Sequence, residues 1–178
     1  MGNSTVVIYK SKYGATEQYA KWIAEELGAD LIRREDFKAK DFQRYDNIIY
    51  GGGLQAGGIK GFELIRKNIR LLAGKKVVTF AVGLSVDDKE NRMQVRDINF
   101  DKDELKRLTV YYCKGAFDPA QVKGIDKGII KVCLSMLEST RLNWTPEQKQ
   151  LYQDMQEGAN YVDRKYINPI VAEFKETE

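Results

Sequence analysis

Residues 6–20, VVIYKSKYGATEQYA, begin as a run of β-branched residues and end in an amphipathic pattern. The run VVIY (6–9) suits a buried strand. TEQYAKWIAEELG (16–28) predicts a helix, because its apolar positions recur every three or four residues, and Gly28 is suited to end it. SKYGAT (11–16) fits neither element, so a loop of hydroxyl and glycine residues joins the first strand to the first helix.

This loop has the features of an anion site. A loop that leads into a helix presents unpaired N–H groups and the positive end of the helix dipole, which attract a phosphate. Ser11 and Thr16 add hydroxyl donors, and Gly14 lets the backbone turn closely around an anion. Taken alone, the loop fits equally well a structural alternative, in which Thr16 only caps the helix and Gly14 only serves a turn. The chain lacks the motif GxxxxGKS/T of nucleoside-triphosphate-binding loops and the motif GxGxxG of dinucleotide-binding loops, so both kinds of site are excluded.

The alternation of strand and helix patterns continues along the chain. Further strands are expected at DLIRR (30–34), NIIYGGG (47–53), KVVTFAVG (76–83) and LTVYYCKG (108–115). Helices are expected at FELIRKNIRLLAG (62–74), where Gly74 is the stop, and, with a loop, in 87–100. Such alternation favours parallel βαβ units with helices on both faces. We therefore predict the α/β class, with a three-layer, doubly wound, five-stranded parallel sheet in a single domain spanning residues 1–178.

Residues 118–144 interrupt this alternation. VKGIDKGIIKVCLSML (122–137) is rich in aliphatic residues and carries a lysine at every fourth position from 123 to 131. NWTPEQ (143–148) then marks a helix start with a capping box, and we expect this helix to run to residue 166 and cover the sheet. Residues 118–144 are therefore interpreted as an insertion between the last strand and the last helix.

Two other strand ends are rich in glycine or leave backbone exposed, namely GGGLQAGG (51–58) and VGLSVDD (82–88). Ligands of doubly wound sheets bind beyond the carboxyl ends of the strands. Five glycines in eight residues cost much chain entropy, so 51–58 is either a flexible loop or a backbone surface for a flat ligand. Together with the loop at 11–16, these strand ends predict a mononucleotide site.

The composition excludes several kinds of chemistry. The 178 residues contain no histidine, which removes Ser-His and Cys-His catalysis and the commonest zinc ligand, so no metal site is expected. Cys113 and Cys133 are too far apart for a CxxC motif and are expected to be reduced, buried thiols. The net charge of +3 is dispersed, which argues against a nucleic-acid partner. No catalytic side chain is identified, and the chemistry is expected to come from a cofactor.

The expected location follows from the hydropathy of the chain. No apolar run approaches the roughly 20 residues of a membrane-spanning helix, and the N-terminus lacks a secretory pattern, so we expect a cytoplasmic protein. The segment 122–137 either packs its aliphatic face on the core or rests peripherally on the anionic inner face of a membrane. Homo-oligomers are common in this fold, and the sequence marks no interface.

With SKYGAT, GGGLQAGG and GLSVDD (83–88) at successive strand ends, the chain resembles the flavodoxin-like, FMN-binding proteins. The resemblance covers the order of all five strands and implies FMN as the cofactor. It implies that the phosphate is held by Ser11, Lys12, Tyr13, Gly14, Ala15 and Thr16. It also implies that Gly53, Leu54, Gln55, Ala56, Gly57, Gly83, Leu84 and Ser85 face the flavin ring. Lys12 either adds charge to the phosphate site or is solvated, and Tyr13, where the family often has a hydroxyl residue, contributes its backbone.

Within that family the chain is most similar to the menaquinone-dependent protoporphyrinogen dehydrogenases. GAFDPAQVKGIDKGIIKVCLSMLEST (115–140) resembles the basic, aliphatic segment of those enzymes in place and character. The resemblance implies an FMN-dependent oxidoreductase that oxidises protoporphyrinogen or a related substrate and passes electrons to a quinone. One alternative is a non-catalytic flavodoxin-type protein that transfers electrons between redox partners, although such carriers are usually strongly acidic. Another is a scaffold of this fold that has lost FMN.

Overall fold

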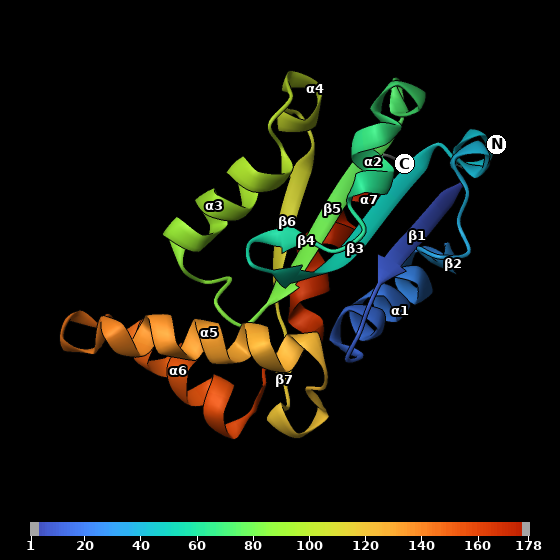
Figure 1. The fold of residues 1–178 in the computed structure, drawn as a ribbon. Coiled ribbons are helices and arrows are strands. Elements are labelled where there is room, and N and C mark those ends of the chain that lie inside the picture. Colours follow the sequence, from blue (N-terminus) through green and yellow to red (C-terminus); the bar gives the residue numbers. More distant parts are fainter. Residues whose placement is uncertain (1–3, 176–178) are drawn as a thin grey trace.

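The structure is a computed structural model that describes residues 4–175. Its centre is a sheet of five parallel strands in the order β2-β1-β3-β5-β6 (Figure 1). The strands are β1 (Thr5–Lys10), β2 (Asp30–Arg33), β3 (Asn47–Gln55), β5 (Lys76–Gly83) and β6 (Thr109–Lys114). A short strand, β4 (Gly58–Ile59), folds back on β3 as an antiparallel hairpin. The predicted α/β class and the five-stranded, doubly wound parallel sheet are confirmed.

The apolar runs of the sequence form the middle of this sheet. Ile8 of β1 lies between Ile32 of β2 and Tyr50 of β3 in the strand register. Phe80 of β5 lies between Gly51 of β3 and Tyr111 of β6. The central strands are covered on both faces, which explains why they read as continuous apolar runs rather than as alternating patterns.

Two helices and a 3-10 turn cover one face of the sheet. They are α1 (Ala15–Leu27), η5 (Arg164–Ile167) and α7 (Asn168–Lys175). Tyr19 and Ile23 of α1 and Ile170 of α7 are buried against the sheet. As predicted, α1 ends at Gly28, which has a φ of 58° and donates its N–H to the carbonyl of Ala24.

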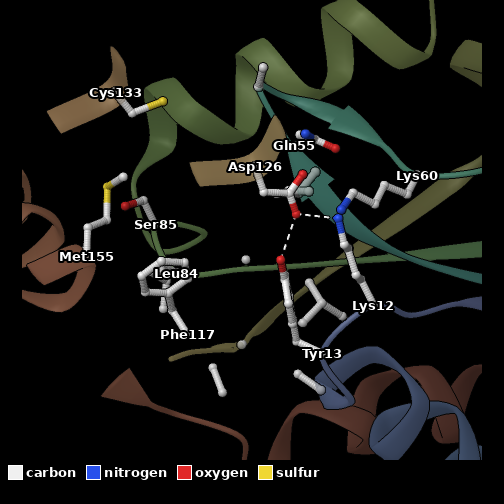
Figure 2. Close-up of a pocket in the computed structure, with 18 of the residues that line it drawn as sticks. Lys12, Tyr13, Gln55, Lys60, Leu84, Ser85, Phe117, Asp126, Cys133 and Met155 are labelled. Atoms are coloured by element: carbon white, nitrogen blue, oxygen red, sulfur yellow. Dashed lines mark hydrogen bonds and ion pairs between the residues drawn. The ribbon is translucent and has the colours of Figure 1, made fainter. Parts of the chain in front are cut away.

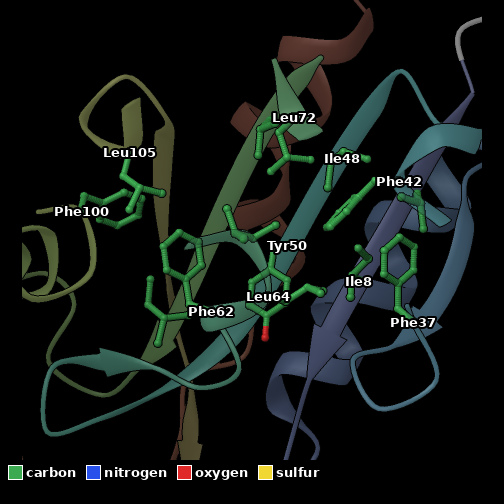
Figure 3. Close-up of a cluster of buried hydrophobic side chains, with 14 of the residues drawn as sticks. Ile8, Phe37, Phe42, Ile48, Tyr50, Phe62, Leu64, Leu72, Phe100 and Leu105 are labelled. Carbon is green, nitrogen blue, oxygen red and sulfur yellow. The ribbon is translucent and has the colours of Figure 1, made fainter. Parts of the chain in front are cut away.

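The opposite face is covered by shorter elements around an aromatic core (Figure 3). These elements are η1 (Ala39–Arg44), α2 (Glu63–Lys67), η2 (Ile69–Leu72), α3 (Lys89–Asn99) and α4 (Asp103–Lys106). The ring centroids of Phe62 and Phe100 lie 5.0 Å apart in this core. The single helix predicted over 62–74 is wrong, because α2 and η2 are separate. Asn68 lies between them and its side chain donates to the carbonyl of Leu64 at 2.8 Å, a local bond that competes with helix continuation.

A helical hairpin lies beyond the carboxyl ends of the strands rather than on a face of the sheet (Figure 1). It consists of α5 (Ile125–Ser139), the turn η4 (Arg141–Asn143) and α6 (Pro146–Glu157). The predicted start of α6 is confirmed, since the hydroxyl of Thr145 accepts the Gln148 N–H at 3.2 Å. This hairpin contains most of the segment 118–144, whose status as an insertion stays a prediction.

The predicted continuation of α6 to residue 166 over the sheet is wrong. The helix ends at Gly158, whose φ of 91° favours glycine. The chain then forms β8 (Ala159–Asn160), which pairs with β7 (Ala116–Phe117) and returns the backbone to the sheet. The covering helix is therefore α7, and a 3-10 turn, η3 (Pro119–Gln121), leads from β7 toward α5.

The two cysteines differ in burial. Both cysteines are free, but only Cys113 is buried, so the expectation of a second buried thiol at half-buried Cys133 is wrong. Burial raises the pKa of the Cys113 thiol to about 12.

Within residues 4–175, no helix is both long enough and apolar enough to cross a membrane.

Candidate functional site

A cavity of about 370 Å³ opens at the carboxyl ends of β1, β3 and β5. The connection after β1 leads to α1 on one face of the sheet, and the connection after β3 leads to α2 on the other. A crevice therefore forms between these neighbouring strand ends, where doubly wound folds bind their ligands. All the predicted binding residues except Gly14 line this cavity, and their roles in binding stay a prediction.

The loop 11–16 is shaped by two local contacts. The N–H of Gly14 donates to the hydroxyl of Ser11 at 3.1 Å, and Gly14 itself has a φ of 99° that favours glycine. Helix α1 begins at Ala15, so the N-cap is Gly14 and no side chain caps the helix. Thr16 lies inside the first turn, which rules out the alternative in which it serves only as a cap. The first turn of α1 thus presents its N–H groups beside two hydroxyl residues, as an anion requires.

Thr16 faces the neighbouring strand end. A Cβ atom added at Gly53 would lie 3.5 Å from the Thr16 hydroxyl oxygen and would meet no closer atom. The backbone of β3 is therefore bare where it borders the phosphate loop. A flat group can approach it there without meeting a side chain from residue 53.

At other positions of 51–58, different neighbouring atoms require glycine. A Cβ atom at Gly51 would lie 2.0 Å from the ring of Phe80, and one at Gly52 would lie 2.7 Å from the carbonyl oxygen of Lys60. Both belong to β3, so the alternative of a flexible loop over 51–58 is wrong. The turn itself is made by Ala56 and Gly57, whose φ values are 48° and 80°.

The loop after β5 closes the cavity beside this hairpin. A Cβ atom at Gly83 would lie 3.0 Å from Leu54, so the two predicted ring loops are in contact. The carbonyl of Ser85 accepts a hydrogen bond from Asn91 of α3 at 3.2 Å. These contacts hold the backbone of 83–85 against the cavity.

The side chains of Lys12 and Tyr13 both reach Asp126 on α5 (Figure 2). The Tyr13 hydroxyl donates to Asp126 Oδ2 at 2.6 Å, and Lys12 Nζ forms an ion pair with the same oxygen. The hydrogen bonds from Lys12 and Tyr13 hold the pKa of the Asp126 carboxyl below its usual value, and the pKa of Lys12 is raised. Lys12 is half exposed to solvent and also ion-paired, and the Tyr13 hydroxyl is engaged by Asp126. The contribution of either residue to a phosphate site stays a prediction.

A second lysine lies at the same end of the cavity. Lys60 follows β4 and lines the cavity near Lys12 and Asp126 (Figure 2). Desolvation lowers the pKa of its ammonium group, the Asp126 carboxylate opposes this shift, and the charges of Lys12 and Lys10 add to it. This end of the cavity therefore carries charged and hydrogen-bonding side chains.

The opposite end of the cavity is apolar. Figure 2 places Leu84, Phe117, Cys133 and Met155 there, away from the lysines. The hairpin supplies most of this wall, through Ile129, Ile130 and Cys133 of α5 and Leu151 and Met155 of α6. The cavity thus has a charged end at the loop 11–16 and an apolar end under the hairpin. In the described range 4–175, no three His, Cys, Asp or Glu side chains are grouped so that they could hold a metal ion.

Comparison with known proteins decides the family. The sequence model of the flavodoxin domain matches residues 6–142, which is more than half of the chain. The chain belongs to the flavodoxin family. No curated protein matches this flavodoxin-family chain.

Several solved structures are similar to it at low identity. The flavodoxin, WrbA-like protein from Agrobacterium tumefaciens is 18% identical, with 64% of this chain and 84% of that chain covered and a TM-score of 0.49. Oxidised flavodoxin 2 from Bacillus cereus is 18% identical, with 76% and 99% covered and a TM-score of 0.48. A flavoprotein in complex with FMN from Lactobacillus acidophilus is 15% identical, with 64% and 93% covered and a TM-score of 0.41.

The residues present suit the cofactor of the flavodoxin family. Flavodoxins bind FMN at the switch point between β1 and β3, where this chain has its cavity. The phosphate loop offers the first turn of α1 and the hydroxyls of Ser11 and Thr16. The bare backbone at Gly53 and the loop 83–85 leave room for a flat ring. The chain's own residues therefore fit FMN.

Several lining residues were not predicted from the sequence. These are Lys60, Asp126 and the apolar residues of the hairpin. Only the tertiary fold sets where their segments lie relative to β1. The aliphatic spacing in 122–137 signalled an apolar face, but it did not say what that face covers. In the structure this face lines the cavity, and no residue of α5, all of which is described, is buried.

Proposed function

We propose that this flavodoxin-family protein binds FMN and acts as an oxidoreductase on a small molecule. The observation that carries the proposal is the α5–α6 hairpin, which adds an apolar wall to the cavity beside the two predicted ring loops. A carrier that docks on redox partners needs the edge of its flavin accessible to another protein. A cavity with an apolar wall on the side of the hairpin favours a small substrate instead.

FMN supplies the redox chemistry when bound, by taking a hydride or single electrons. The residues of the chain then have three tasks. The loop 11–16 binds the phosphate, the backbone N–H groups of 53–57 contact the edge of the ring, and the hairpin excludes water. No side chain is assigned a proton-transfer role.

For the substrate, we propose a porphyrinogen or a similar reduced ring, with a quinone as the electron acceptor. Two features support this. The segment 115–140 resembles that of the menaquinone-dependent protoporphyrinogen dehydrogenases, and the α5–α6 hairpin gives the cavity an apolar wall away from the predicted phosphate loop. A porphyrinogen is a largely apolar ring system, which suits this wall.

Stepwise anaerobic reduction of the FMN-loaded protein tests the enzyme against the carrier. We expect the visible spectrum to pass from the oxidised to the fully reduced form with little of any one-electron form between them. Reduction in two well-separated one-electron steps would favour the alternative of an electron-transfer protein. No flavin spectrum after addition of excess FMN would refute the proposal as a whole and favour the scaffold.

We also propose that α5 contacts an anionic membrane peripherally, at the inner face. Helix α5 exposes three large apolar side chains, each one or two turns from the next: Ile125 (84% exposed), Val132 (59%) and Met136 (67%). Leu142 of η4 is 99% exposed. Exposed lysines at 127 and 131 accompany them on α5. An exposed apolar stripe on a helix whose other exposed face carries lysines is typical of helices that lie in the membrane interface.

The expected result is sedimentation of the protein with phosphatidylserine-containing vesicles at low salt. Lys127→Gln together with Lys131→Gln should weaken vesicle binding roughly 30-fold, since each basic residue near an anionic surface contributes about 1 kcal/mol. Lys149→Gln, on exposed α6, is the matched control and should change binding much less. Absence of sedimentation at low salt would contradict the membrane contact, and a dimer in gel filtration would then assign the stripe to self-association.

A further inference from the structure

Asp126 is the side chain by which α5 reaches the predicted phosphate loop. Its carboxylate accepts from the Tyr13 hydroxyl at 2.6 Å and forms an ion pair with Lys12 (Figure 2). The Asp126 side chain is only 16% exposed, whereas that of Lys12 is 49% exposed. An anionic group of the protein therefore sits, with little access to water, on the loop that is proposed to bind an anion.

The other charges around this loop do not remove the conflict. Lys10 forms an ion pair with Glu35 at 3.1 Å, so its charge is already balanced. Lys60 is a further nearby cation, and it is attracted by the Asp126 carboxylate, but its partial desolvation is the larger influence and disfavours the charged form. Lys12 is the cation within the loop itself, and its charge is balanced by Asp126.

We propose that Asp126 is a specificity-determining residue of the cofactor site, because its carboxylate competes with the phosphate of the cofactor for Lys12. The proposal rests on the proposed binding of FMN. Two like charges near one cation repel each other, and one lysine cannot neutralise both. Asp126 thus lowers the preference of the loop for FMN over riboflavin, which has the same ring without the phosphate.

The test compares the affinities of the two flavins by fluorescence titration at low salt. Asp126→Asn retains an oxygen that can accept from Tyr13 but removes the charge. We expect this variant to bind FMN about threefold to tenfold more tightly, the effect of one partly exposed charge on another, and to bind riboflavin unchanged. Raising the salt concentration should shrink the difference.

Glu138→Gln is the matched control, because it removes the same charge from an exposed position near the other end of α5. It should alter neither affinity. Weaker FMN binding by Asp126→Asn, or an equal gain for both flavins, would overturn the competition and make Asp126 a support of the site or of the hairpin. If the unchanged protein bound neither flavin, the proposed function would fail together with this inference. If the unchanged protein bound FMN and Asp126→Asn had the same FMN-to-riboflavin selectivity, only the inference would be refuted.

Discussion

Replacing Ser11 by alanine together with Thr16 by valine is expected to lower the FMN affinity by a factor of roughly 10² to 10⁴. A hydrogen bond to a charged group contributes about 1.5–3 kcal/mol, and the two hydroxyls would each lose one to the phosphate. Thr16 is buried in the first turn of α1, so water cannot readily replace its hydroxyl. Valine keeps the shape of threonine and isolates the loss of the hydroxyl.

Fluorescence titration with FMN measures this effect, and riboflavin is the internal control. Riboflavin affinity should fall far less, because it has no phosphate for these hydroxyls to contact. Ser135→Ala with Thr109→Val removes the same two groups from exposed positions that do not line the cavity, and should leave both affinities unchanged. Equal losses for FMN and riboflavin would show that the loop does not bind the phosphate.

Gly51→Ala is expected to destabilise the protein by about 3 kcal/mol, at the upper end of what overpacking of a core costs. The added Cβ would lie 2.0 Å from Cζ of Phe80, whose ring is fully buried in the core beside β3. The ring has nowhere to move without displacing α1 or its neighbours on that face. For a chain of this size, such a loss lowers Tm by about 6–12 °C.

Gly128→Ala is the matched control for the glycine substitution. Gly128 lies within α5 and a Cβ there would meet nothing within 4 Å, so alanine should stabilise the helix by up to about 1 kcal/mol. Thermal unfolding followed by circular dichroism compares the two variants. If Gly51→Ala melted like the unchanged protein, the close contact between β3 and Phe80 would not explain why residue 51 is glycine.

Much of the fold could be predicted from local pattern. The runs VVIY and KVVTFAVG became β1 and β5, and Gly28 and Thr145 ended and began the helices that their positions indicated. These features depend on side chains a few residues apart, so the sequence shows them directly. The helix predicted through 166 failed because the chain leaves α6 at Gly158 and pairs β8 with β7, a strand more than 40 residues earlier in the chain. The helix predicted over 62–74 failed for a local reason, the hydrogen bond from Asn68 to the carbonyl of Leu64.

The glycines of 51–58 show the same division within one motif. The sequence left two alternatives there, a flexible loop or a backbone surface for a flat ligand. In the structure, Phe80 and Lys60 account for Gly51 and Gly52, while Gly53 faces the phosphate loop. A glycine in a sequence indicates that a side chain is absent. Only the tertiary structure shows which neighbouring group occupies or borders that space.

By itself, the sequence determined the α/β alternation, the hydroxyl-rich loop before α1 and the glycine-bearing strand ends. Together these indicate a mononucleotide site. Only the tertiary structure decided that α5 and α6 wall the cavity and that Asp126 meets Lys12, a residue 114 positions away in the chain. Periodicity shows that a helix has an apolar face, and a charged residue is expected to form an ion pair or to face water. Which partner is met depends on how the chain is connected through the sheet, and no short stretch of sequence contains that information.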